Sequence, residues 1–275
     1  MEEPGRTVTA GALRRHATIT IGGIAIGVHT ADEEFLRMLE SRYAGFLDFR
    51  EACDYEFAVD LTPPVESSGD DDVRVFRNGA RWQLERGDFR AEWDPVARHG
   101  RIRQSANPYS LDTVLRIVHT LVLAREGGFL VHASSAIRNG RAFLFAGLSG
   151  AGKTTISRLA PPDANVLTDE ISYVRKEADG YVAFGTPFAG DLGKAGDNLK
   201  APLAAIYLLA QGPENRVEEV GPAEAARGLL ANILFFAEDA DLVRAVFRSA
   251  LEFVERVPVR RLTFLPTARV WEWVR

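Results

Sequence analysis

The amino-acid sequence predicts an α/β protein with a smaller N-terminal α/β part over residues 1–107 and a larger part over residues 108–275. Before Asn107, short segments with the period-two alternation of strands surround one amphipathic helix. After Asn107, a long stretch with helical spacing leads into apolar strands, a glycine-rich loop and further helical segments. This order is typical of a sheet covered by helices.

The composition excludes several classes of protein. The 275 residues are 46% hydrophobic and 26% charged, as in a globular chain with a core, and the net charge of −5 does not favour binding to nucleic acid. The single cysteine, Cys53, cannot form an internal disulfide or a cysteine zinc site. The acidic start, Met1–Gly5, lacks the layout of a signal peptide, and no apolar run is long enough for a membrane span. We therefore expect a cytoplasmic protein that binds no membrane.

Alternation and turn signals define the elements of the first part. Residues 18–28 predict two strands joined at Gly22-Gly23, and Asp32–Tyr43 follows as a helix with Thr30 or Asp32 as its N-cap. Asn78-Gly79 is a strong hairpin signal. The remaining expected elements are strands over 55–61, 73–76, 81–84 and 89–93, and a polar loop over 63–72.

The second part begins with a helix that Ser110 can cap and that Gly127-Gly128 ends. Strands over 129–137 and 141–146 are joined at Asn139-Gly140, another hairpin turn. The other expected elements are a helix to about Leu159, strands over 166–167 and 203–209, helices over 222–238 and 239–256, and terminal strands over 261–265 and 269–274.

The segment from Gly147 to Thr154 fits the pattern G-x-x-x-x-G-K followed by Ser or Thr, known as the P-loop or Walker A motif. Its glycines let successive N–H groups point at phosphate oxygens, Lys153 reaches the β- and γ-phosphates, and the Thr154 hydroxyl ligates Mg²⁺. A chance glycine-rich turn is the alternative, but a strand before the loop and a helix after it favour nucleotide binding. The expected ATP-binding residues are Gly147, Leu148, Ser149, Gly150, Ala151, Gly152, Lys153, Thr154 and Thr155.

Two adjacent acids, Asp169 and Glu170, follow a short apolar run downstream of this motif. In a P-loop protein one such carboxylate serves Mg²⁺, and the other accepts a proton from an attacking hydroxyl or water. The alternative is that the two acids have no chemical role and lie at a solvent-exposed strand end. We assign Asp169, with Thr154, to the metal and Glu170 to the base, although spacing does not decide between the two acids.

His132 lies on an apolar strand before the motif, where a lone histidine is more often a core residue than a functional one. The other histidines, His16, His29, His99 and His119, have no partners in the sequence pattern, so we expect them to be structural or exposed.

From His132 to the C-terminus, the chain resembles the catalytic domain of HPr kinase/phosphorylase and its smaller bacterial relatives. The matching pieces are His132-Ala133-Ser134, the glycine-rich motif, Asp169-Glu170, Gly185-Thr186-Pro187-Phe188, the strand Pro202–Leu209 and the stretch from Val257 through Leu262. The resemblance implies a P-loop kinase domain that transfers ATP phosphate to a protein serine, with His132 in the active site. Some relatives phosphorylate a serine of ribosomally made peptides, such as lasso peptide precursors.

The sequence departs from that family at two places. The second acid of the usual Asp-Asp pair is Glu170, and Phe184 stands ahead of Gly185 where the bifunctional enzymes have an acidic metal ligand. Asp191 is the nearest substitute. The expectation therefore does not extend to phosphorolysis or to HPr as the substrate.

Taken together, these residues predict an ATP- and Mg²⁺-dependent kinase in which Lys153, Asp169, Glu170 and His132 act on the transferred phosphate. The favoured partner is a peptide or protein that carries an acceptor serine, and the sequence leaves a homo-oligomer and GTP open. A small-molecule alcohol kinase is one alternative. A nucleotide-dependent switch with slow hydrolysis is another, and it would release free phosphate rather than phosphorylate an acceptor.

Overall fold

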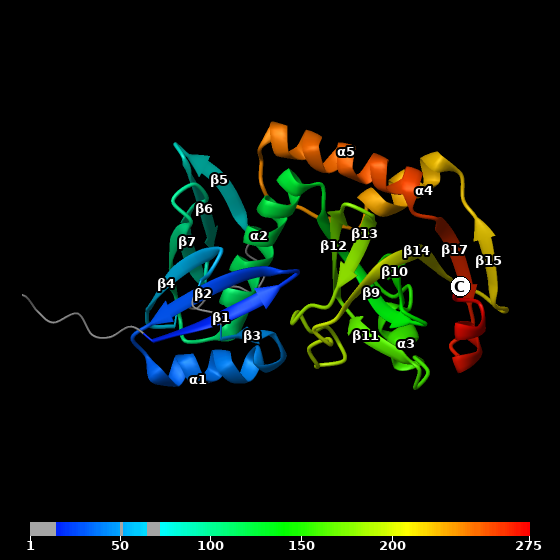
Figure 1. Cartoon of the computed structure of the whole chain (residues 1–275), viewed down its shortest axis with the longest axis horizontal. Coiled ribbons are helices and arrows are strands. Elements are labelled where there is room, and N and C mark those ends of the chain that lie inside the picture. The colour runs from blue at the N-terminus through cyan, green and yellow to red at the C-terminus, as the bar shows by residue number, and fades with distance from the viewer. Residues whose placement is uncertain (1–14, 50–51, 65–71) are drawn as a thin grey trace, which may run out of the picture.

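The computed structural model describes residues 15–49, 52–64 and 72–275. In this part of the chain two β-sheets stand side by side, and the long helix α2 (Pro108–Glu126) lies between them (Figure 1). The mixed α/β architecture expected from the sequence is confirmed. Most of the polar loop expected over 63–72 lies outside the described residues.

The first sheet has the strand order β3-β1-β2-β4-β8-β7-β6-β5. Its strands are β1 (Arg15–Ile21), β2 (Ile24–Thr30), β3 (Leu47–Asp48), β4 (Tyr55–Leu61), β5 (Arg74–Asn78), β6 (Arg81–Arg86), β7 (Phe89–Asp94) and β8 (His99–Gln104). Both expected hairpins, at Gly22-Gly23 and Asn78-Gly79, are confirmed. Strand β8 escaped prediction; it pairs in parallel with β4, a contact between segments distant in sequence.

Helix α1 (Glu33–Arg42) packs on this sheet, and the short 3-10 helix η1 (Ala44–Phe46) follows it. Asp32 is the N-cap: its Oδ1 accepts a hydrogen bond from the Phe35 N–H at 2.8 Å. Phe35 and Leu39 are buried on the face toward the sheet, in agreement with the helical spacing of the apolar residues.

The second sheet has the order β10-β9-β12-β13-β14-β17-β15, and β11 and β16 pair with β9. Because β14 pairs with β13 near its start and with β10 further along, the sheet turns back on itself. The strands are β9 (Phe129–Arg138), β10 (Arg141–Ala146), β11 (Ala164–Thr168), β12 (Ile171–Glu177), β13 (Gly180–Phe184), β14 (Lys200–Gln211), β15 (Arg216–Glu219), β16 (Ile233–Leu234) and β17 (Val259–Phe264). The helices of this part are α3 (Lys153–Arg158), α4 (Pro222–Leu230), α5 (Ala240–Arg256) and the 3-10 helix η2 (Ala268–Glu272).

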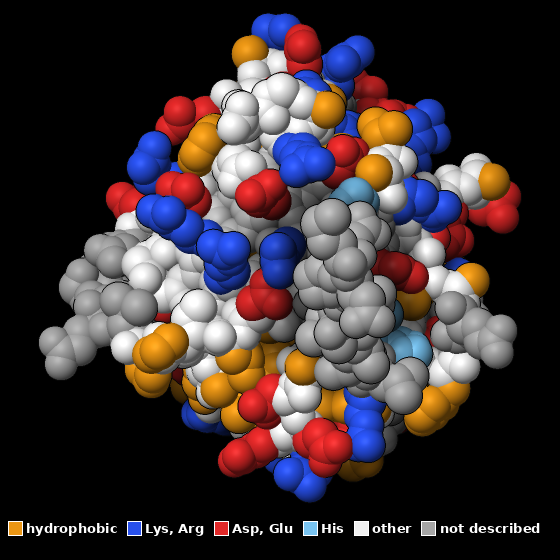
Figure 2. Space-filling model, turned by 90° about the vertical axis from the view of Figure 1, so that its left-hand side faces the viewer, with side chains coloured by type: hydrophobic (Ala, Val, Ile, Leu, Met, Phe, Trp, Pro, Cys, Tyr) orange, Lys and Arg blue, Asp and Glu red, His pale blue; other side chains and the backbone are white. Residues whose placement is uncertain are grey.

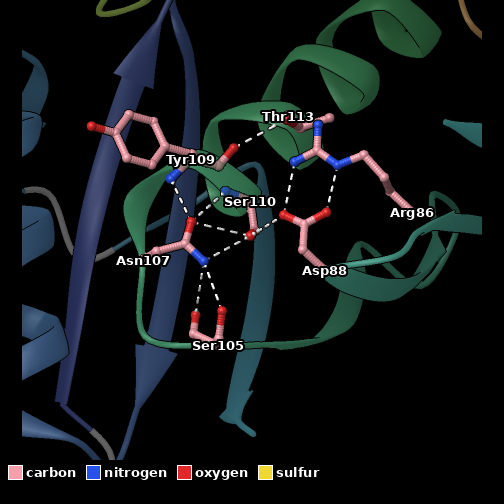
Figure 3. A network of polar contacts seen from close by, with 7 residues as sticks. All are labelled: Arg86, Asp88, Ser105, Asn107, Tyr109, Ser110 and Thr113. Atoms are coloured by element: carbon pink, nitrogen blue, oxygen red, sulfur yellow. Dashed lines mark hydrogen bonds and ion pairs between the residues drawn. The ribbon is translucent and has the colours of Figure 1, made fainter. Parts of the chain in front are cut away.

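The start of α2 corrects one expectation, because Asn107 and not Ser110 is the N-cap (Figure 3). The Asn107 Oδ1 accepts from the N–H groups of Tyr109 and Ser110 at 3.0 Å. Ser110 instead donates its hydroxyl to Asp88 at 2.6 Å, and Arg86 binds the same carboxylate. This network ties the beginning of α2 to the β6–β7 turn of the first sheet.

Two C-terminal expectations are wrong. The helix over 222–238 ends at Leu230, because the Asn232 side chain donates to the Gly228 carbonyl and Ile233–Leu234 then pairs with β9. The strand expected over 269–274 is replaced by η2, in which Trp271 is buried and donates its indole N–H to the Ile156 carbonyl at 3.1 Å. Strands β12, β13 and β15 were not predicted.

The hydrophobic core crosses from one sheet to the other. One cluster begins at residues of the first sheet such as Ile19 and Trp82 and continues through the buried face of α2. The same cluster reaches Tyr173 on β12 and Phe184 on β13. Helix α2 therefore packs against both sheets. This packing fixes the position of the α2 side chains relative to the second sheet. Within the described residues, no helix is both long and apolar enough to cross a membrane.

Candidate functional site

The glycine-rich loop (Gly147–Thr154) runs from the end of β10 into α3, between the strand and the helix expected around it. Gly152 adopts φ +108°, a left-handed conformation, and a Cβ there would lie 2.6 Å from the Phe264 ring. Both the backbone and the space therefore require glycine at this position. Of the other expected binding residues, Leu148, Ser149 and Gly150 are exposed, and Gly147, Ala151 and Thr155 are half-buried.

Lys153 is buried, with 7% of its surface exposed, and its ammonium group folds back onto the loop. Nζ donates to the carbonyl oxygens of Gly147 at 2.8 Å and Leu148 at 3.3 Å. Burial lowers the pKa of Lys153, and the nearby carboxylates of Glu170 and Asp191 oppose that shift. The cation thus stands within electrostatic reach of two acids that come from other segments.

Asp169, directly after β11, is 1% exposed and anchors a long loop (the 185–199 loop). Its Oδ1 accepts from the Gly190 N–H at 2.9 Å, and its Oδ2 accepts from the Leu192 N–H at 2.8 Å. A Cβ on Gly190 would come within 3.0 Å of both acids of the pair, Asp169 and Glu170. Close packing of the loop backbone on the acid pair therefore depends on Gly190.

Glu170 and His132 meet beside Lys153, although they come from different segments. The His132 Nε2 lies 3.4 Å from the Glu170 Oε1, because Ile171 of β12 is opposite His132 in the pairing with β9. Burial and then the charge of Lys153 lower the pKa of His132, while Glu170 acts in the opposite direction. Burial and Lys153 thus favour the uncharged imidazole, which can donate one hydrogen bond and accept another.

Thr154 and Asp191 face each other across the loop, with the Thr154 Oγ1 and the Asp191 Oδ2 at 3.4 Å. Asp191 lies between the two residues whose N–H groups donate to Asp169, so Asp169 also positions this third carboxylate. The described residues contain no group of three or more His, Cys, Asp or Glu side chains that could hold a metal ion on their own. Oxygen ligands from Thr154 and one or two carboxylates suit Mg²⁺, which retains water and phosphate ligands as well.

Arg116, on α2, reaches the same region and was not predicted from the sequence. Its guanidinium carbon lies 4.9 Å from the centroid of the Phe188 ring, in the 185–199 loop. The signal that could have identified it is a charged residue in an otherwise buried helical stretch, Leu111–Val122. Asp191, which the sequence indicates only as the nearest substitute for a missing acid, contacts Thr154 in the structure.

The remaining histidines lie away from this site. His119 is fully buried on α2, 3.2 Å from the Tyr173 hydroxyl, and burial lowers its pKa to about 3. His16 and His29 stack at 5.1 Å on the first sheet, and His99 is exposed. These places agree with the structural or exposed character expected of them.

Comparison with known proteins covers the same region. The family model of SynChlorMet cassette protein ScmC matches residues 103–275, which include α2, the glycine-rich loop, the acid pair and His132. No curated protein matches the sequence. The match extends over more than half of the chain, so the protein belongs to the family of SynChlorMet cassette protein ScmC.

Proposed function

We propose that this protein is an ATP- and Mg²⁺-dependent kinase of the HPr kinase-like P-loop type, which transfers the γ-phosphate to a serine hydroxyl of a peptide or protein. The observation that carries the proposal is the meeting of His132, Lys153 and Glu170 beside the glycine-rich loop. A general base and a phosphate-binding cation in one place are parts that phosphoryl transfer uses.

In this proposal the glycine-rich loop cradles the phosphates with its backbone N–H groups. Lys153, which donates to the carbonyls of Gly147 and Leu148, exchanges these for oxygens of the β- and γ-phosphates. Thr154 would hold Mg²⁺ together with Asp169 or Asp191, because Asp191 contacts the Thr154 hydroxyl and Asp169 holds the backbone on both sides of Asp191. When bound, the ion neutralises charge that develops on the phosphate oxygens.

Glu170 is the proposed base, because its carboxylate is half-exposed whereas both Asp169 oxygens accept backbone N–H groups. Glu170 takes the proton of the serine hydroxyl, and the serine oxygen forms a bond to the γ-phosphorus. The bond from that phosphorus to the bridging oxygen breaks, and ADP leaves with its electron pair. His132 orients Glu170 through the contact at 3.4 Å, or lies beside the acceptor.

Three lines support a serine acceptor in a peptide or protein. The motifs from His132 onward resemble those of protein-serine kinases, and the half-exposed Glu170 gives an acceptor access to the site. The first sheet, joined to the site through α2, offers additional surface for a macromolecular acceptor. A small alcohol would need no such surface.

The test is transfer of labelled phosphate by the full chain. With [γ-³²P]ATP, Mg²⁺ and a library of serine-containing peptides, label is expected in peptide, and Lys153→Ala is expected to abolish it while the protein stays folded. Lys176→Ala is the matched control, since Lys176 pairs with Glu252 on the surface. Label found only as free phosphate would favour the nucleotide-dependent switch.

Binding is measured separately by thermal denaturation. A ligand that binds only the native state raises the melting temperature by mass action, so ATP with Mg²⁺ should raise it and ATP with a chelator should raise it less. The absence of any shift at millimolar ATP would contradict the proposal.

A further inference from the structure

Helix α2 carries a second cation, Arg116, whose charge interacts with that of Glu170 in the acid pair. Arg116 follows Asp112 by one helical turn, and its guanidinium packs over the fully buried Phe188 at 4.9 Å. Phe188 belongs to the 185–199 loop, which Asp169 holds through the N–H groups of Gly190 and Leu192. Arg116 therefore packs against the same loop that Asp169 of the acid pair holds.

The neighbours of Arg116 leave part of its hydrogen-bonding capacity unused. Asp112, its nearest acid on α2, already accepts from the Arg42 guanidinium and the Tyr43 hydroxyl, each at 2.5 Å. The Arg116 Nε is buried and has no hydrogen-bond partner among the described residues. A buried donor without a partner costs free energy, and an anion bound beside it would remove that cost.

The electrostatic surroundings connect Arg116 to the candidate site. Burial lowers the pKa of Arg116, and the charges of Asp112 and Glu170 oppose that shift. The charge of Arg116 also contributes to the lowered pKa of His132. The guanidinium thus acts on both residues that meet at 3.4 Å beside Lys153.

We propose that Arg116 binds the γ-phosphoryl group of the nucleotide and stabilises the charge that develops on it during transfer. The planar guanidinium presents donors in a fork that matches two phosphate oxygens, and it stays charged even where it is desolvated. Arg116 and Lys153 then hold the transferred group from two different elements, α2 and the glycine-rich loop. This inference rests on the proposed function.

The experiment compares the affinities for ATP and ADP, because only ATP carries the γ-phosphate. Dissociation constants for both nucleotides with Mg²⁺ are measured by titration calorimetry on the full chain, as wild type and as Arg116→Gln. Wild type is expected to prefer ATP. Arg116→Gln should weaken ATP binding by about tenfold or more, the scale of a lost charge-assisted contact, with little change for ADP. Transfer to peptide should slow by about a hundredfold or more.

Arg42→Gln is the matched control, since Arg42 pairs with Asp112 at 2.5 Å from a different helix, α1. It should leave the preference for ATP over ADP unchanged, even where it lowers the melting temperature. If Arg116→Gln also keeps the preference while the melting temperature falls, Arg116 is only a structural cation and the inference is overturned.

Three further outcomes are separable. If Arg116→Gln does not fold, Arg116→Lys decides: it keeps a charge without the fork, so the preference for ATP should fall severalfold, and an unchanged preference overturns the inference. If wild type binds neither nucleotide, the proposed function itself fails. If wild type binds and prefers ATP but Arg116 is indifferent, the proposed function stands without this residue.

Discussion

The surface charges of the first sheet differ from two buried charges beside the glycine-rich loop of the second sheet, although the second sheet also carries surface pairs such as Arg260 with Glu219. On the first sheet, charges pair with one another across neighbouring strands at the surface, as Arg101 does with Asp60 and Arg81 with Glu92. The end of the molecule that this sheet forms shows basic and acidic side chains intermixed (Figure 2). The sheet packs on a core with buried aromatic residues, which include Trp93.

At the second sheet, two charged side chains are buried and bonded to backbone rather than to each other. Asp169 accepts two loop N–H groups, and Lys153 donates to two loop carbonyls. Surface ion pairs contribute little to stability, whereas a buried charge is costly and persists where the surrounding structure holds it. We therefore expect the surface pairs to contribute little to the free energy of unfolding, and we treat the two buried charges as candidates for a functional role.

Glu170→Gln is expected to have a larger effect than any substitution of a surface charge. The substitution keeps the volume and removes the proton-accepting charge, so transfer should slow by about a hundredfold or more with near-normal ATP affinity. Transfer rates and ATP titrations measure the two effects. If both remain at the wild-type level, the base lies elsewhere, with Asp169 and His132 as the next candidates.

Asp169→Asn should act on binding and on the fold. The amide offers one acceptor where two N–H groups need one each, so stability should fall by about 1–3 kcal/mol in urea denaturation. The thermal shift caused by Mg²⁺ with ATP should shrink as well. Asp163→Asn, at an exposed acid paired with Arg138, should change neither quantity. If Asp169→Asn instead slows transfer and Glu170→Gln weakens binding of ATP with Mg²⁺, the roles of metal ligand and base are reversed between the two acids.

His119, buried on α2 between the two sheets, makes the free energy of unfolding depend on pH. Burial, and then Arg175, lowers its pKa to about 3 in the folded protein, while the unfolded chain binds a proton near pH 6.5. Stability is therefore complete above pH 6.5 and is lost as pH falls toward 3, by roughly 2 kcal/mol between pH 7 and pH 4.5. His119→Gln lacks this titration, so its urea stability should fall less over that interval. Parallel pH profiles of the two proteins would contradict the prediction.

Arg101→Ala should have the smallest effect, because the Arg101–Asp60 pair is largely exposed on the first sheet. The free energy of unfolding should change by less than about 1 kcal/mol, and nucleotide binding should not change. Urea denaturation at low and high salt checks this. A larger loss would show that the pairs of the first sheet are structural and would weaken the contrast between the sheets.

The sequence by itself determined the features that depend on a few neighbouring residues. The turns at Asn78-Gly79 and Asn139-Gly140 follow from residues that tolerate positive φ, and both lie where expected. The glycine-rich motif between a strand and a helix was predictable for the same reason. Helix α1 begins after Asp32, one of the two caps expected from the sequence.

Only the tertiary structure decided which segments meet. Strand β9 pairs with β10, β11, β12 and β16, and this pairing brings His132 opposite Ile171 and therefore next to Glu170. The same pairing ends the helix over 222–238 early, and the packing of α2 between the sheets brings the charge of Arg116 within electrostatic reach of Glu170. Local preferences act over a few residues, whereas strand pairing and core burial join residues far apart in the chain, so their outcome is not written in any short pattern.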